Sequence, residues 1–179
     1  MRRKLLVLVL VLQLAWLLGT VATQETALVR GQLIRLETQP VDPRDLLRGD
    51  YLVLNYKISN VPKALFTPPL AENLPPGEVV WIAVSPHGEF YEVVRASRER
   101  FEPAADQILI KAQTSWNNRR SDAEHLQYGL EQYFVHERTG NPRGKITVEA
   151  VVSTSGRASI KQVFLDGRPY SEAMKEQAQ

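Results

Sequence analysis

The first twenty or so residues form the most apolar part of the chain. Positions 5–18 are hydrophobic except for Gln13, three cations occupy positions 2–4, and no acidic residue occurs before Glu25. A cationic tip followed by an apolar core is typical of a segment that directs a protein to a membrane. The positive-inside rule then predicts that the tip stays in the cytoplasm and that the rest of the chain crosses.

The leader fits either a retained anchor or a cleaved signal peptide. Residues 20–22 (Thr-Val-Ala) form a passable small-residue cleavage site. As a helix, residues 5–22 would be roughly 27 Å long, close to the hydrocarbon core of about 30 Å. We favour a single-pass anchor in the plasma (inner) membrane, with residues 1–24 as anchor or signal peptide and residues 25–179 as one periplasmic or extracytoplasmic domain.

Beyond the leader, short stretches of alternating apolar and polar residues predict β-strands. The clearest is 51–59, where Leu52, Leu54, Tyr56 and Ile58 share one face. The other predicted strands are 32–38, 79–84, 89–95, 107–113, 145–153 and 157–165, with a further run at 125–135 that is interrupted at Gly129. No segment sustains helical periodicity over a dozen residues. The pattern predicts a mainly β fold, a small sandwich or partly open barrel of about seven strands.

One connection in this predicted β domain is unusually long. Residues 61–77 hold five prolines and should form a loop. Loops of that length in compact domains are commonly functional. We therefore expect this segment to lie at the surface, where it could contact a partner.

Charge and cysteine content exclude several classes of function. The chain has 22 Lys and Arg against 20 Asp and Glu, so the part beyond the cationic tip, with 19 against 20, has a net charge of −1. That balance leaves no basic face for nucleic acid. The absence of cysteine excludes thiol catalysis, cysteine-ligated zinc, iron–sulfur clusters and lipid attachment through a cysteine.

Two conspicuous motifs carry a resemblance to a known family. Residues 49–56 read G-D-Y-L-V-L-N-Y and follow P-V-D-P-R-D-L-L-R at 40–48, and residues 128–137 read Y-G-L-E-Q-Y-F-V-H-E. With its N-terminal apolar segment and closing hairpin, the chain resembles the GDYXXLXY family. It departs from that family's second signature, Y-G-I-E-x-Y-F-V-P-E-G, at Leu130, His136 and Arg138. The resemblance implies a bacterial protein anchored near its N-terminus, and it supplies no catalytic residues.

The motif residues have both a structural and a functional interpretation. Structurally, Gly49 permits a turn, Asp50 accepts backbone N–H bonds across it, and Leu54 and Tyr56 belong to the core. Functionally, a charged rim of Asp42, Arg44, Asp45, Arg48 and Asp50 would bind a partner. The candidate binding residues are Asp42, Arg44, Arg48, Gly49, Asp50, Tyr51, Leu54, Tyr56, Tyr128, Gly129, Glu131 and Tyr133.

Candidate chemistry outside the motifs is sparse. No two of His87, His125 and His136 have a helical ligand spacing, so we expect no metal site and no cofactor. Asp50 and Glu131 could form a carboxylate pair for acid–base catalysis. The alternative is that Glu131 pairs with a buried arginine, such as Arg48, and fixes the packing of the two signatures.

Taken together, the sequence favours a binding or accessory module over an enzyme. Its partner would be an integral membrane protein or an envelope component, contacted through loop 61–77 and the aromatic run 128–134, with residues 5–22 in the membrane. The alternative, an envelope hydrolase, requires the carboxyl groups of Asp50 and Glu131 within about 10 Å of each other. A passive scaffold subunit is a third interpretation.

Overall fold

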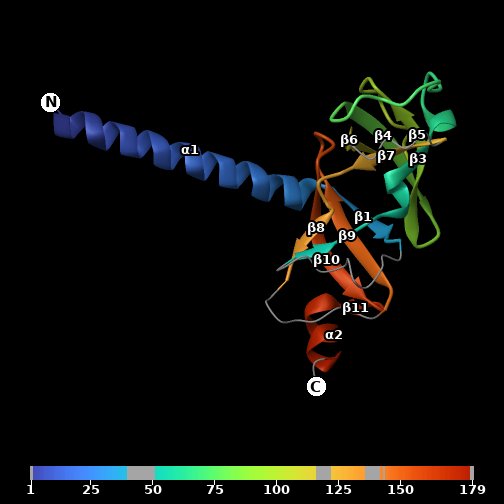
Figure 1. Ribbon diagram of the computed structural model, residues 1–179. Coiled ribbons are helices and arrows are strands. Elements are labelled where there is room, and N and C mark those ends of the chain that lie inside the picture. The colour runs from blue at the N-terminus through green and yellow to red at the C-terminus, as the bar shows by residue number, and fades with distance from the viewer. Residues whose placement is uncertain (1, 40–50, 116–121, 136–141, 143, 178–179) are drawn as a thin grey trace.

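An isolated N-terminal helix precedes a β body. The computed structural model describes residues 2–39, 51–115, 122–135, 142 and 144–177. Helix α1 (Arg2–Arg30) leaves the body as one rod (Figure 1), and every residue from Val7 to Thr20 is exposed. In the part of the chain that the structure describes, no helix has both the length and the apolarity of a membrane span. Gly31 alone separates α1 from the first strand.

The body is mainly β, as predicted. The described residues form eleven strands: β1 (Gln32–Glu37), β2 (Tyr51–Val53), β3 (Asn60–Pro62), β4 (Val79–His87), β5 (Phe90–Ser97), β6 (Ile108–Thr114), β7 (Ala123–Gln127), β8 (Gln132–Phe134), β9 (Ile146–Val152), β10 (Ala158–Leu165) and β11 (Arg168–Pro169). The count exceeds the predicted seven because the run 125–135 holds two strands, β7 and β8, and because the short strands β3 and β11 were not predicted. The predicted strand 51–59 is shorter in the structure, since the chain passes from β2 into a short 3₁₀ helix, η1 (Lys57–Ser59).

A four-stranded antiparallel sheet adjoins the root of α1, in the order β1-β9-β10-β11. The hairpin β9–β10 is the closing hairpin that the sequence predicts. Helix α2 (Tyr170–Gln177) follows β11 and packs on β10. The sequence did not predict α2, because eight residues are too few for helical periodicity to stand out.

A five-stranded sheet in the order β3-β7-β6-β4-β5 curls into a nearly closed barrel. Its two edges are joined by the chain that follows β3 and a second 3₁₀ helix, η2 (Lys63–Leu65). There Phe66 forms a parallel bridge with Ala96 of β5, and the Thr67 N–H donates to the Ala96 carbonyl at 2.8 Å. Joining the edges removes unpaired strand groups from the surface. The strand pattern predicted a sandwich or a partly open barrel, and this sheet has the barrel-like form.

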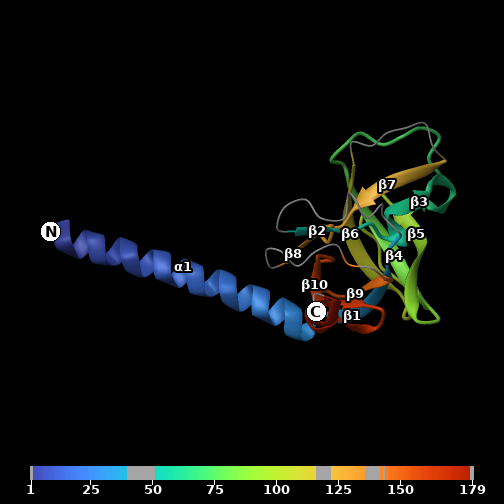
Figure 2. The same cartoon turned by 60° about the horizontal axis from the view of Figure 1, so that its bottom comes forward.

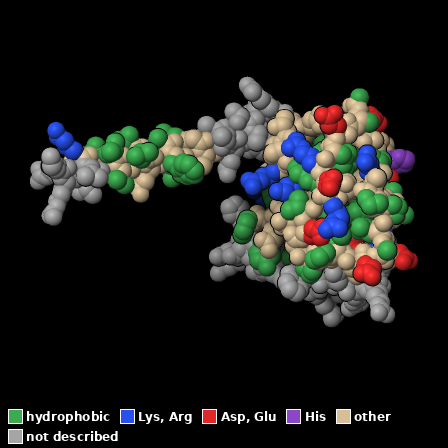
Figure 3. Space-filling view, turned by 90° about the horizontal axis from the view of Figure 1, so that it is seen from above, with side chains coloured by type: hydrophobic (Ala, Val, Ile, Leu, Met, Phe, Trp, Pro, Cys, Tyr) green, Lys and Arg blue, Asp and Glu red, His purple; other side chains and the backbone are tan. Residues whose placement is uncertain are grey.

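The two sheets share one hydrophobic core. Leu36 and Val148 of the first sheet and Ile82 and Ile110 of the second belong to the same cluster of buried side chains. A backbone hydrogen bond from the Lys111 N–H of β6 to the Gly156 carbonyl, 2.8 Å long, ties the β9–β10 turn to the barrel. Both acidic and basic side chains are spread over the face seen in Figure 3. This agrees with the near-neutral charge of the body.

A charged cluster on β1 gives a pH-dependent test of this packing. The Glu37 carboxylate lies 2.7 Å from Lys145 Nζ and 2.5 Å from Lys57 Nζ. Hydrogen bonds from Lys145 and then Lys57 hold the pKa of Glu37 below its ordinary value. A lowered folded-state pKa gives stability above the unfolded-state pKa that disappears as the pH falls. We expect Glu37→Gln to lower the free energy of unfolding by about 0.5–1 kcal/mol at pH 7, and by much less near pH 3. Urea unfolding of both proteins at each pH measures this, and an equal loss at both would contradict it.

Candidate functional site

The two family-like signatures meet in space. Strands β2 and β8 pair in antiparallel register, with Tyr51 opposite Phe134 and Leu52 opposite Tyr133. The Leu54 N–H extends the ladder by donating to the Glu131 carbonyl at 2.8 Å. The two blocks therefore form a single ribbon, the β2–β8 ribbon, although they are far apart in the sequence.

Two buried tyrosines reinforce this meeting from both sides. The Tyr56 hydroxyl donates to the Leu130 carbonyl at 2.7 Å, and the Tyr128 hydroxyl donates to the Ile58 carbonyl at 2.5 Å. Tyr56 is 0% exposed and Tyr128 6%. Burial, and secondarily the charge of Glu131, raises the pKa of both hydroxyls. We call Tyr56, Tyr128 and Glu131 the signature clasp.

Glu131 closes the turn at the start of the second signature. Its carboxylate accepts the Tyr128 N–H at 2.6 Å across Gly129, whose φ of 79° lies in the left-handed region. Glu131 is only half-buried. Its predicted partner, Arg48, lies outside the described residues. Within the described part, the Glu131 carboxylate thus binds the backbone of its own signature, while its carbonyl accepts the Leu54 N–H of the other.

The remaining candidate residues divide into placed and unplaced groups. Leu54 and Tyr56 are core residues, as the structural interpretation predicts, and Tyr51 and Tyr133 are half-buried. Gly49 and all residues of the charged rim lie outside the described residues, the rim being Asp42, Arg44, Asp45, Arg48 and Asp50. The charged rim and the carboxylate pair of the hydrolase hypothesis therefore stay predictions.

The histidines do not converge in the described structure. His87 ends β4 in the β4–β5 hairpin, and His125 of β7 places Nδ1 3.0 Å from Asn60 Oδ1. His136 lies outside the described residues. Among the residues that are placed, no cluster of three His, Asp or Glu could hold a metal ion.

The proline-rich segment 61–77 is packed far more closely than the sequence predicted. Val61, Phe66 and Leu74 are at most 4% exposed and belong to the core, while Leu65 and Leu70 pack against it. The expectation that the whole segment offers a surface is therefore wrong, because its apolar residues pack into the hydrophobic core. Residues 67–73 are its more accessible part, with Leu70 and Asn73 half-buried.

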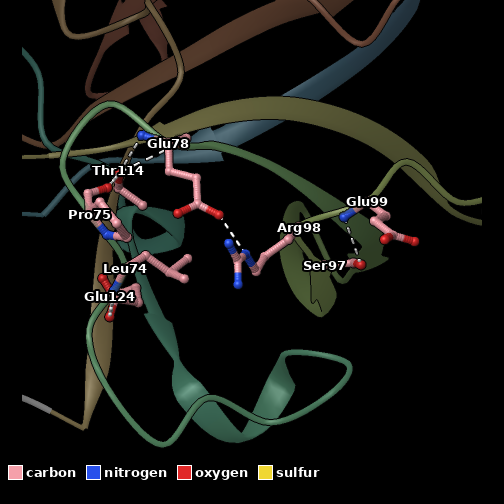
Figure 4. Close-up of polar contacts among 8 residues, drawn as sticks. All are labelled: Leu74, Pro75, Glu78, Ser97, Arg98, Glu99, Thr114 and Glu124. Carbon is pink, nitrogen blue, oxygen red and sulfur yellow. Dashed lines mark hydrogen bonds and ion pairs between the residues drawn. The ribbon is translucent and has the colours of Figure 1, made fainter.

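A polar clamp fixes the C-terminal end of this segment (Figure 4). Thr114 Oγ1 donates to the Pro75 carbonyl at 2.5 Å and accepts the Glu78 N–H at 2.9 Å. The Leu74 N–H donates to the carboxylate of Glu124 at 3.1 Å, and Glu124 is only 1% exposed. Sequence reasoning missed Glu124. The signal was a carboxylate at an inward position of a strand, two residues before the core residue Leu126.

An aromatic pair on the β2–β8 ribbon combines an exposed ring, that of Phe134, with the half-buried ring of Tyr51. The rings of Tyr51 and Phe134 meet edge to face with centroids 6.3 Å apart, and Phe134 is 76% exposed. Of the aromatic residues in the predicted contact run 128–134, Phe134 is the exposed one. Tyr128 is buried, as is Leu130 beside it. In both Figure 1 and Figure 2 the ribbon lies on the side of the body from which α1 leaves.

A cavity of about 620 Å³ lies apart from both signatures. It opens between the start of β1, the β5–β6 connection and the β9–β10 turn, and its lining includes Gln32, Arg100 and Thr154. Arg100 is already engaged, since it donates to the Thr154 carbonyl at 3.1 Å and lies over the Trp81 ring. No residue of either signature lines this cavity.

Comparison with known proteins identifies one family. The model of the GDYXXLXY protein family matches residues 13–163, a range that contains both signatures and the whole clasp. No curated protein matches the chain, and neither does any solved structure.

Proposed function

The chain belongs to the GDYXXLXY family, and we propose that it is a membrane-tethered binding module. Residues 5–22 would anchor it in the plasma membrane with the N-terminus in the cytoplasm. The β body would work outside the membrane, where it contacts an integral membrane protein or an envelope component.

The tether is supported by the character of α1. Between Val7 and Thr20 its residues are exposed and, apart from Gln13, Gly19 and Thr20, hydrophobic or aromatic, as the green side chains along the rod indicate (Figure 3). A helix that is apolar on all sides is stable where those sides are buried in lipid or protein. Within the described residues the helix makes few contacts with its own body, and we propose that lipid covers its apolar sides.

The binding surface that we propose is the tip of the proline-rich segment, residues 67–73. Its key feature is an accessible tip held between buried anchors, Phe66 on one side and Leu74 on the other. A loop fixed in advance loses less conformational entropy when it binds. Confinement to the membrane raises the effective concentration of a partner there, so a small surface suffices.

The geometry of the clasp supports binding over hydrolysis. A general acid or base needs a pKa near the working pH and access to substrate. The Tyr56 and Tyr128 hydroxyls are buried and their pKa values are raised away from neutrality. The Glu131 carboxylate is engaged by the Tyr128 N–H. These side chains serve the packing of the signatures.

Site-specific photo-crosslinking in intact bacterial cells tests the proposed surface. We would place benzoylphenylalanine at Ala71 or Glu72, both exposed in the tip, and at Lys161 of β10 as an exposed control. We expect an adduct with an integral membrane or envelope protein at the two tip positions and not at Lys161. Equal labelling at all three positions would contradict the tip as the contact surface.

The tether has its own test. Protease added to spheroplasts that express the full chain should degrade the β body, because the body lies outside the membrane. A body that resists protease in intact spheroplasts, but is degraded after lysis, would contradict the proposed topology.

A further inference from the structure

We propose that the β2–β8 ribbon rests on the lipid surface, with the Phe134 ring in the headgroup layer beside the anchor. This proposal rests on the tether proposed above and adds a second point of membrane contact. The two family signatures would then hold the body in a fixed orientation on the membrane.

The first argument is the exposure of Phe134. In the described part of the body, three large hydrophobic residues are exposed: Leu33 at 46%, Val94 at 39% and Phe134 at 76%. Phe134 makes an edge-to-face contact with Tyr51 of the paired strand. Aromatic side chains are enriched where proteins meet the headgroup region of a bilayer.

The second argument is position. The ribbon lies on the side of the body from which α1 departs, in both views (Figures 1 and 2). Leu33 lies three residues beyond the last residue of α1, so a second exposed hydrophobic residue lies at the root of the helix. An apolar surface on the side of an anchor is placed where it can meet lipid.

The third argument is the length and stiffness of the connection. If the apolar segment ends at residue 22, residues 23–30 add about 12 Å of helix before the body. The headgroup layer itself is about 5–8 Å thick on each side. Because α1 runs to Arg30 and only Gly31 precedes β1, the body cannot move far from the surface.

The size of the surface favours lipid over a protein partner. Phe134 and its neighbour Tyr51 present little more than one aromatic ring, and an aromatic side chain buries about 150–250 Å². A stable protein interface buries about 1,200 Å² or more. One exposed ring suits an interfacial anchor that adds to a transmembrane helix.

The absence of cysteine allows a direct test with single-cysteine variants of the full chain. Phe134→Cys, Val94→Cys and Leu12→Cys would each carry an environment-sensitive fluorophore in phosphatidylethanolamine–phosphatidylglycerol vesicles. Quenchers would be iodide in water and spin labels at headgroup or acyl-chain depth. We expect the label at residue 134 to be quenched at headgroup depth, the label at residue 94 by iodide, and the label at residue 12 at acyl-chain depth.

Three outcomes would overturn the proposal in distinguishable ways. If the label at residue 134 is as accessible to iodide as that at residue 94, while residue 12 is in lipid, the tether holds and the ribbon contact is wrong. If residue 12 is also in water, the tether fails and the ribbon contact fails with it. If residue 134 is shielded in native membranes but not in pure lipid, the occupant is a protein, and the lipid assignment is wrong.

Discussion

Replacing Gly156 with alanine is expected to lower the free energy of unfolding by about 3 kcal/mol, because the new methyl group has no room. An ideal Cβ at Gly156 would lie 2.7 Å from Trp81 Cζ3 and 3.2 Å from the Lys111 backbone nitrogen. Trp81 belongs to β4 and carries Arg100 on its ring. The Lys111 nitrogen is fixed by its hydrogen bond to the Gly156 carbonyl, so neither neighbour can retreat without loss.

Gly77 provides the matched control for that prediction. Its φ of 79° is close to the 81° of Gly156, but nothing lies within 4 Å of a Cβ built there. Gly77→Ala should therefore lose only the backbone cost of about 1–2 kcal/mol. Urea unfolding of the full chain in mild detergent, followed by tryptophan fluorescence, compares the two variants. Equal losses would show that the β9–β10 turn does not pack against the barrel as described.

The alternation of apolar residues predicted burial more reliably than it predicted pairing. Within 51–59, the inward positions Leu52, Leu54, Tyr56 and Ile58 are all buried. Yet strand β2 itself ends at Val53. Beyond it, the Tyr56 hydroxyl donates to the Leu130 carbonyl, and the next residues form a 3₁₀ turn. Alternation of apolar and polar residues shows which side chains face inward. It does not show which strand the backbone pairs with.

Proline content, in contrast, indicated the backbone form of segment 61–77 but not its burial. It correctly indicated that 61–77 is not one long strand, but it could not reveal the packing of the apolar residues between the prolines. Phe66 closes the barrel against Ala96, and Leu74 is bonded to Glu124. Such contacts depend on strands that are distant in the sequence but close in space. The composition of the segment itself does not identify those strands.

The meeting of the two signatures was equally beyond local reasoning. The sequence suggested that Glu131 packs the two blocks together by pairing with an arginine such as Arg48, which lies outside the described residues. In the structure the Glu131 carbonyl accepts the Leu54 N–H, and its carboxylate accepts the Tyr128 N–H. The pairing of β2 with β8, however, joins residues some eighty positions apart. Its register is fixed by buried groups on both sides, since Tyr56 and Tyr128 each donate to a carbonyl beside the other.

Removing either hydroxyl of the clasp should weaken the fold by about 1–3 kcal/mol, since each leaves a buried carbonyl without its donor. The variants are Tyr56→Phe, which frees the Leu130 carbonyl, and Tyr128→Phe, which frees the Ile58 carbonyl. Tyr91→Phe is the control, because within the described residues the Tyr91 hydroxyl makes no hydrogen bond, and we expect a change below about 0.5 kcal/mol.

The double variant tests whether the clasp acts as one unit. Both hydroxyls are influenced by the charge of Glu131, and residues that share such a network are coupled by about 0.5–3 kcal/mol. We therefore expect the loss in the double variant to differ from the sum of the single losses. Strict additivity would show that the two tyrosines stabilise the signatures independently.

The clasp also makes an alkaline prediction. Burial raises the pKa of both tyrosines above the ordinary value of 10.0, so in the folded state they stay protonated where unfolded tyrosines ionise. Their contribution is then complete below pH 10 and is lost as the pH rises beyond it. Wild type should lose stability between about pH 10 and 11 more steeply than the double Tyr→Phe variant, which has no clasp hydroxyl to ionise. Parallel pH profiles of urea unfolding would contradict the burial of these hydroxyls, and with it the joining of the two signatures through their tyrosines.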